Sequence, residues 1–166
     1  AVRVVVDRSA SMLRETEGAT KYLQAARLAA CLCYLILQQR DSVGLVMPAS
    51  DSTFWLPIRS VDNHLVEILR ALAVREPAGE DRLAACLKAV LDRAERRGMV
   101  VVVSDLMFDP EPVQAQLARL QAQGHEVLLF QLRDPVEEDF PFNRWVQFHD
   151  RENAAVRHRI DPVPLK

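Results

Sequence analysis

Short apolar segments alternate along this chain with longer segments of helical periodicity, and this alternation restricts the possible folds. Val2–Val6 and Met99–Val103 are almost purely apolar, without the polar alternation of a half-exposed strand. Strands buried on both faces and separated by helices indicate a three-layer α/β fold with a mostly parallel sheet. The 166 residues are enough for one domain, spanning 1–166, with its own core.

The pattern predicts a six-stranded, mostly parallel sheet with one short antiparallel edge strand. Too few residues separate the second and third strands for a crossover helix, and Pro57 suits an edge. We expect Ser60 to cap the second helix, Gly98 to close the third and Gly124 the fourth. The expected strands are Val2–Val6, Ser42–Met47, Thr53–Ile58, Met99–Val103, Glu126–Leu132 and Arg144–Phe148, and the expected helices are Lys21–Arg40, Val61–Val74, Asp81 or Arg82 to Arg97, and Pro110 or Glu111 to Gln123.

Charge and cysteine content exclude several classes of protein. A net charge of −2 with scattered basic residues gives no footprint for nucleic acid or an anionic membrane. An odd number of cysteines in apolar helical stretches argues against a disulfide framework and favours a reducing compartment. We interpret Cys31, Cys33 and Cys86 as small core residues.

The chain begins directly in a strand, with no leader, and no run is long enough to cross a bilayer. We interpret it as a domain excised from a longer protein. We expect this domain to lie in the cytoplasm without membrane contact, which leaves open a membrane anchor elsewhere in the parent protein.

Polar residues follow two of the expected strands at their carboxyl ends. Val2–Val6 leads into Asp7-Arg8-Ser9-Ala10-Ser11, and Met99–Val103 leads into Ser104-Asp105. Ligands of open parallel sheets bind at this end, and carboxylate and hydroxyl oxygens suit Mg²⁺, Mn²⁺ or Ca²⁺. Asp, Ser and Ser at alternate positions of a tight loop can turn their oxygens to one point. The alternative is that these residues only cap turns.

At these residues the chain resembles a known family. VVVDRSASM looks like the metal-ion-dependent adhesion site of von Willebrand factor A domains, which begins with DxSxS after the first strand. The resemblance continues through KYLQAARLAACLCYLILQQRDSVGLVM, VVVSDLMFD, GHEVLLFQLRDPVEEDFPF and FHDRE. This succession resembles a bacterial subgroup, the domain-of-unknown-function family numbered fifty-eight, over nearly the whole chain.

The resemblance implies a Rossmann-like (von Willebrand factor A) fold and a metal site built from three loops. Asp7, Ser9 and Ser11 match the first loop and Asp105 the last. In the family the serines bind the metal directly, the aspartates usually act through water, and a partner's carboxylate completes the shell. It also implies a protein-interaction module that works with a MoxR-type AAA ATPase in assembling or activating other proteins.

The second loop departs from the family pattern. Asp81 stands where the family has a threonine, in the segment Ala78-Gly79-Glu80-Asp81-Arg82-Leu83. As a ligand it would add a third negative charge, hold the metal more strongly and polarise a partner's carboxylate less. Alternatively, Arg82 or Arg8 offsets the charge and the site is degenerate, or Asp81 simply caps a helix.

The sequence favours binding over catalysis. Ser9 and Ser11 have no nucleophile elbow around them, and no histidine is spaced as their base. The leading hypothesis is a metal-dependent module, not an enzyme, whose protein partner presents an acidic residue. The alternative is a metal-independent scaffold with a degenerate site, and the minor alternative is a metal-dependent phosphoesterase.

Overall fold

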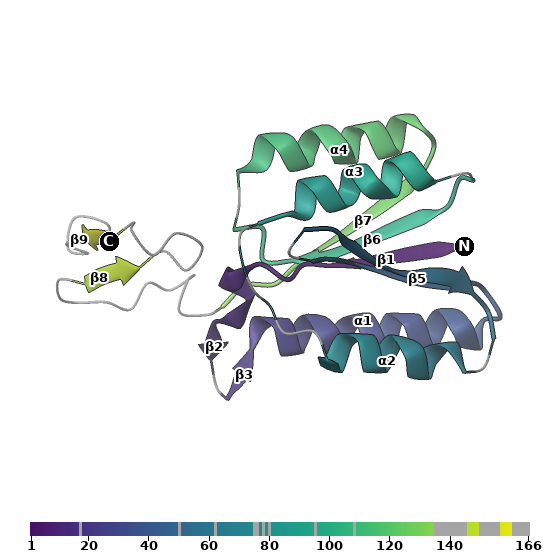
Figure 1. Ribbon diagram of the computed structural model, residues 1–166, viewed down its shortest axis with the longest axis horizontal. Coiled ribbons are helices and arrows are strands. Elements are labelled where there is room, and N and C mark those ends of the chain that lie inside the picture. The colour runs from purple at the N-terminus through teal and green to yellow at the C-terminus, as the bar shows by residue number, and fades with distance from the viewer. Residues whose placement is uncertain are drawn as a thin grey trace.

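A five-stranded sheet forms the centre of the protein (Figure 1). The computed structural model describes residues 1–16, 18–49, 51–61, 63–74, 77, 79, 81–94, 96–107, 109–134, 146–149 and 157–160. The strand order is β5-β4-β1-β6-β7. These strands are β1 (Val2–Val6), β4 (Val43–Pro48), β5 (Thr53–Arg59), β6 (Met99–Ser104) and β7 (Glu126–Gln131).

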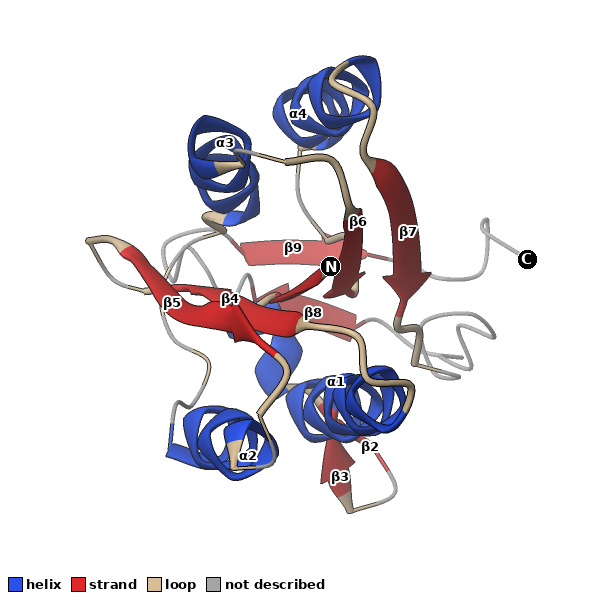
Figure 2. Ribbon diagram, turned by 90° about the vertical axis from the view of Figure 1, so that its right-hand side faces the viewer, coloured by secondary structure: helices blue, strands red, loops and turns tan. Residues whose placement is uncertain are grey.

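Helices cover both faces of the sheet and give three layers, as Figure 2 shows. One pair, α1 (Lys21–Gln38) and α2 (His64–Val74), packs on one face. The other pair, α3 (Leu83–Arg93) and α4 (Pro110–Ala122), packs on the opposite face. This arrangement confirms the expected α/β class. Within the described residues no helix is long and apolar enough to span a membrane.

Alternate residues of the central strands point to opposite faces of the sheet, so one strand serves two cores. Val4 packs in the cluster that contains residues of α1 and α2, whereas Val5 packs in the cluster of α3 and α4. Both side chains are fully buried. Burial on both faces is why these strands carry no polar alternation.

The strand order reverses between β1 and β6. These strands pair in parallel, but the chain leaves β1 toward α1 on one face and leaves β6 toward α4 on the other. The carboxyl ends of two such strands frame the crevice in which α/β proteins bind ligands. β5 is the expected edge strand, and its pairing with β4 is antiparallel.

The connection from β1 to α1, expected to be a polar loop, contains short ordered elements. A 3-10 helix, η1 (Ala10–Leu13), is followed by a hairpin of β2 (Glu15–Thr16) and β3 (Ala19–Thr20). Thr20 then caps α1, because its hydroxyl accepts a 3.1 Å hydrogen bond from the Leu23 N–H. The hairpin therefore delivers the chain directly into the helix.

The expectation that Arg144–Phe148 forms a sixth strand of the central sheet is wrong. The described residues of this segment belong to β8 (Val146–His149), which pairs with β9 (Arg157–Ile160) in a separate two-stranded sheet. The segment alternates Val146 and Phe148 with Gln147, a pattern that does not require burial on both faces. The rest of that expected strand, and the tail from Arg151 apart from β9, lie outside the described residues.

Three smaller expectations are also wrong. The second helix begins at His64, whose N–H closes a turn onto Val61, so Ser60 does not cap it. The third helix ends at Arg93, because Ala94 has extended backbone angles, so Gly98 does not close it. Cys31 is exposed on α1 and does not join the core, unlike Cys33 and Cys86. Helical periodicity places the face of a helix correctly but not its ends.

Candidate functional site

Asp7 follows β1 and is held from two sides at the carboxyl edge of the sheet. Its N–H donates to the Val103 carbonyl at 2.9 Å, which extends the β1–β6 pairing by one step. Its Oδ2 accepts a 2.6 Å hydrogen bond from the Ser104 hydroxyl, and its Oδ1 accepts one of 2.9 Å from the Ser9 N–H. With 1% of its surface exposed, Asp7 is a fixed, buried carboxylate.

The two serines after Asp7 turn their hydroxyls toward each other, as their alternate spacing predicted. Ser9 Oγ and Ser11 Oγ are 2.9 Å apart, and Ser11 Oγ donates to Asp105 Oδ1 at 3.3 Å. η1 begins directly after Ser9, so its first turn brings Ser11 back above the strand end. The first and last predicted loops are therefore joined by hydrogen bonds between the side-chain oxygens of Ser9, Ser11 and Asp105.

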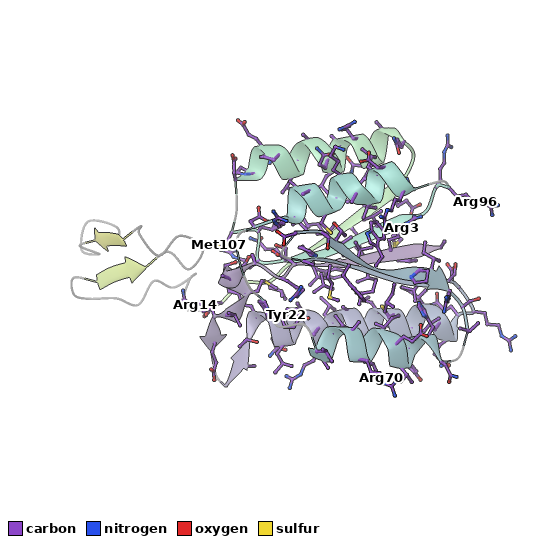
Figure 3. The ribbon with its side chains drawn as sticks, viewed as in Figure 1. Arg3, Arg14, Tyr22, Arg70, Arg96 and Met107 are labelled. Carbon is purple, nitrogen blue, oxygen red and sulfur yellow. The ribbon has the colours of Figure 1, made fainter. Side chains whose placement is uncertain are left out.

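Asp105 directly follows β6 and is buried at the carboxyl edge of the sheet. Its Oδ2 accepts from the Lys21 ammonium at 3.0 Å, in an ion pair whose side chains are 1% and 7% exposed. Its Oδ1 accepts from the Met107 N–H at 3.2 Å as well as from Ser11. Figure 3 places Met107 and Arg14 at this end of the sheet and Arg96 at the other.

Asp81 lies two residues before α3 and directly precedes Arg82, the N-cap residue of that helix. Its Oδ1 accepts from the Leu83 N–H at 2.8 Å. The same loop touches the first one, because the Ala10 N–H donates to the Gly79 carbonyl at 3.2 Å. The expected neighbours Ala78 and Glu80 lie outside the described residues.

One local device recurs in these loops: a side-chain oxygen accepts from the N–H two residues later. Such turns fix the direction of a polar side chain without help from another segment. Leu106 completes one of them with a φ of 58°, in the left-handed region that residues other than glycine rarely adopt. The four turns are Asp7 with Ser9, Asp81 with Leu83, Ser104 with Leu106, and Asp105 with Met107.

The three carboxylates lie close enough to influence one another. Burial raises the pKa of the Asp7 carboxyl, and the charges of Asp105 and Asp81 raise it further, against the hydrogen bonds from Ser104 and Ser9. Burial also raises the pKa of Asp81, and Asp105 adds to this effect, while the Leu83 N–H opposes it. An accumulation of negative charge at this edge favours a cation.

Arg8 and Arg82 are the arginines that the sequence offered to offset this charge. Arg8 donates from Nη1 to the Pro48 carbonyl at 2.7 Å, and Arg82 is exposed. Lys21 forms an ion pair with an acid of the site, Asp105. Lys21 was not among the residues predicted for the site, and Ser104 was named with Asp105 at the strand end but not as a site residue. Lys21 was detectable in principle, since a lysine in the first turn of a helix opposes the helix dipole and so needs a compensating partner.

The donor set fits a hard divalent cation. Around an octahedral Mg²⁺, neighbouring ligand oxygens lie about 3 Å apart, close to the 2.9 and 3.3 Å that separate Ser9 from Ser11 and Ser11 from Asp105. Within the described residues, no three His, Cys, Asp or Glu side chains form a possible metal cage. The side-chain oxygens of Ser9, Ser11 and Asp105 converge through hydrogen bonds. The Asp7 carboxylate lies beside them, where it accepts from the Ser9 N–H, and Asp81 follows in the neighbouring loop.

An apolar groove opens beside this edge of the sheet, between α1 and α2. Its volume is about 520 Å³. Leu13, two residues after Ser11, lines one end, and Leu23 and Leu69 line the groove with at least 40% of their surfaces exposed. Tyr22, labelled in Figure 3, forms part of the floor and is fixed by a 2.9 Å hydrogen bond from its hydroxyl to the Leu72 carbonyl.

Comparison with known proteins places the chain among relatives of unassigned function. The family model described as protein of unknown function DUF58 matches residues 1–161. This chain is 31% identical over 167 residues to one uncharacterized protein of Mycobacterium bovis and to two uncharacterized proteins of Mycobacterium tuberculosis strains. The match covers 96% of this chain and 51% of each relative, so the chain spans about half the length of the curated relatives it matches.

Two solved structures share the fold. An aerotolerance-related membrane protein from Bacteroides fragilis, with multiple mutations to serines, superposes with a TM-score of 0.65 at 22% identity, covering 98% of this chain and 82% of that one. The conserved hypothetical protein BatB from Bacteroides thetaiotaomicron gives a TM-score of 0.67 at 17% identity, covering 98% and 81%. At these identities the likeness concerns the fold alone.

Proposed function

This chain belongs to the DUF58 family of proteins of unknown function, and we propose that it is a metal-ion-dependent protein-interaction module and not an enzyme. Asp7, Ser9, Ser11 and Asp105 hold a divalent cation, Mg²⁺ in the first place or else Mn²⁺ or Ca²⁺. A partner protein presents an acidic side chain to that cation. The expected von Willebrand factor A-type fold, with its metal-ion-dependent adhesion site, is part of this proposal.

One observation carries the proposal: the continuous contact from Ser9 to Ser11 to Asp105. It brings residues that are 94 positions apart in the chain within 3.3 Å. Turn-capping serines would each satisfy a nearby backbone group, whereas these hydroxyls face one another and a carboxylate. A hard cation binds through hydroxyl and carboxylate oxygens, and it can leave a coordination position for an outside ligand. The carboxyl end of a parallel sheet, where these oxygens lie, is where α/β proteins bind ligands.

Binding is a better use of this site than catalysis. A nucleophilic serine needs a neighbouring base, commonly an imidazole, whereas Ser9 and Ser11 contact each other and Asp105. A bound cation would supply an electrophilic point for a carboxylate of the partner. The residues of this chain would orient the cation, and the Ser104 hydroxyl would hold the Asp7 carboxylate in position beside it.

The groove between α1 and α2 suits the same partner. We assign to it an apolar side chain from a partner segment whose carboxylate lies at the cation. Leu13 ends η1, which begins after Ser9 and contains Ser11, so the groove and the cation site are continuous through one short element. The resemblance described above suggests a MoxR-type AAA ATPase as that partner, which makes assembly or activation of other proteins the cellular role.

Lys21 gives specific support to a second candidate, a metal-independent scaffold. Its ammonium already places a positive charge against Asp105 at 3.0 Å. In that case the Lys21–Asp105 pair would complete the site, and partner binding would need no cation. The two candidates differ in one measurable respect, which is the dependence of binding on a divalent ion.

Calorimetric titration with Mg²⁺ and with Mn²⁺ tests the first candidate. The native chain should bind one ion, and Asp7→Asn and Ser9→Ala should each weaken or abolish binding. Asp51→Asn is the matched control, because Asp51 is an exposed aspartate outside the site. Absence of heat from the native chain with either ion would exclude the metal-dependent module.

Capture of the partner separates the two candidates. A MoxR-type AAA ATPase of the same organism is applied to the immobilised chain in Mg²⁺ and in EDTA. Capture that EDTA removes and Mg²⁺ restores supports the metal-dependent module. Capture that is equal in both conditions, and unchanged by Ser9→Ala, supports the scaffold.

A further inference from the structure

Lys21 occupies an unusual position for a lysine. It is the first residue of α1, where the helix dipole presents its positive end, and only 7% of its surface is exposed. Burial and the dipole both disfavour an ammonium group there. A strong local reason must hold it in place, and the structure provides one in the 3.0 Å contact with Asp105.

The two oxygens of Asp105 have separate roles. Oδ2 faces the Lys21 ammonium, whereas Oδ1 faces the Ser11 hydroxyl and the Met107 N–H. The ammonium therefore neutralises Asp105 from the side away from the serines. The oxygen on the serine side stays among the proposed cation ligands.

We propose that Lys21 is a built-in counter-cation of the site, which takes over the charge-balancing role of the metal when no metal is bound and thereby lowers the affinity for the metal. The proposal rests on the proposed function, because it concerns the same cation site. It assigns to Lys21 a positioning role through Asp105, without contact to the cation or the partner.

Charge determines the sign of the effect. Burial raises the pKa values of Asp7 and Asp81, and the negative charge of Asp105 adds to both effects. Without a metal, the Lys21 ammonium balances the charge of Asp105 at 3.0 Å, so its removal leaves a buried carboxylate without its ion-pair partner. With a metal bound, the ammonium is instead a second positive charge close to a divalent ion, and its removal relieves a repulsion.

Linkage converts this asymmetry into a measurement. Any substitution that destabilises the metal-free protein more than the metal-bound protein must raise the metal affinity by the corresponding factor. Lys21→Met keeps the length and apolar stem of the side chain and removes the charge. It should therefore make the protein more dependent on metal for stability and bind Mg²⁺ more tightly, by about tenfold or more.

The experiment measures thermal unfolding in EDTA and in saturating Mg²⁺, together with calorimetric Mg²⁺ titration, for the native chain and three variants. Lys21→Met removes the charge, and Lys21→Arg retains it. Lys88→Met is the matched control, because Lys88 forms an exposed ion pair with Asp92 at 2.8 Å on α3. We expect a larger Mg²⁺-induced rise in Tm for Lys21→Met than for the native chain, and native-like behaviour for Lys21→Arg and Lys88→Met.

Each outcome decides between the proposals. Tighter Mg²⁺ binding by Lys21→Met than by the native chain supports the counter-cation role. If Lys21→Met binds Mg²⁺ and the native chain does not, the counter-cation role is still supported, and only the metal-dependent function of the native chain is overturned. Equal or weaker binding by Lys21→Met, with binding by the native chain intact, overturns the counter-cation role alone. A Lys21→Met chain that stays unfolded in Mg²⁺ overturns that role as well. Absence of metal binding by every variant overturns both proposals.

Discussion

The Ser104 hydroxyl donates a 2.6 Å hydrogen bond to Asp7 Oδ2 and so joins the ends of two neighbouring strands through their side chains. Ser104 is fully buried and also accepts from the Leu106 N–H at 3.0 Å. Asp7 is thus aligned by β6 before any ligand arrives. The residue that precedes Asp105 in the sequence acts on the first loop of the site, whereas Asp105 itself faces the serines and Lys21.

Ser104→Ala should lower the free energy of unfolding by about 1–3 kcal/mol, because it removes a donor from a buried carboxylate. It should also weaken Mg²⁺ binding about tenfold or more, since Asp7 loses its alignment. Urea unfolding and calorimetry measure the two effects. Ser60→Ala, at an exposed serine, is the control and should change neither. A Ser104→Ala chain of native stability would show that the hydrogen bond has no net effect.

Asp81 can be tested for its two roles separately. Asp81→Asn keeps an oxygen that can accept from the Leu83 N–H, so stability should hold, while loss of the charge should weaken Mg²⁺ binding. Asp81→Ala also removes the hydrogen bond to the Leu83 N–H and should cost about 0.5–1.5 kcal/mol of unfolding free energy. Denaturant unfolding in EDTA isolates the hydrogen bond, and Mg²⁺ titration isolates the charge. Unchanged Mg²⁺ affinity in Asp81→Asn would leave Asp81 with a structural role only.

The thiols should differ sharply in reactivity. Burial raises the pKa of Cys33 to about 12, and burial together with the charge of Asp7 raises that of Cys86 to about 12, so both stay protonated at pH 8. Cys31 is exposed. Iodoacetamide at pH 8 should therefore modify the native protein once, at Cys31, and the unfolded protein three times, as measured by intact mass. Cys31→Ser is the control and should resist modification until unfolded.

Charge in the groove should block the partner but not the metal. Leu69→Asp places a carboxylate in the apolar groove, so capture of the MoxR-type ATPase in Mg²⁺ should fall about tenfold. Calorimetry should find the Mg²⁺ affinity unchanged. Val74→Asp is the matched control, because Val74 is 77% exposed on the same helix and does not line the groove. Equal losses in both variants would argue against the groove as the contact surface.

The α/β class and the antiparallel edge strand could be predicted from the sequence, because each depends on a strong local signal. Apolar runs such as Val2–Val6 have few alternatives to a buried strand. The short connection before Thr53–Arg59 leaves an antiparallel pair as the simple solution. The rule that parallel strands end at one edge placed Asp7 and Asp105 at the same end of the sheet. It did not determine whether their strands are neighbours, which the β1–β6 pairing shows.

What could not be predicted depends on tertiary contacts. Lys21 is separated from Asp105 by 84 residues, and only the folded chain brings them together. The end of α3 at Arg93 and the start of α2 at His64 depend on turns whose local sequence also permits a longer helix. The short segment at Val146–His149 had a strand pattern, but its pairing with β9 is not encoded in its own residues.

The loops at the carboxyl edge each close on themselves through a side chain that accepts from the N–H two residues later. A loop held in this way has little conformational entropy left to lose when a ligand arrives. Association at this edge therefore requires no slow ordering of the backbone. We expect its rate to be set by diffusion and by the dehydration of the incoming ion, so differences in affinity among variants should appear mainly as differences in residence time.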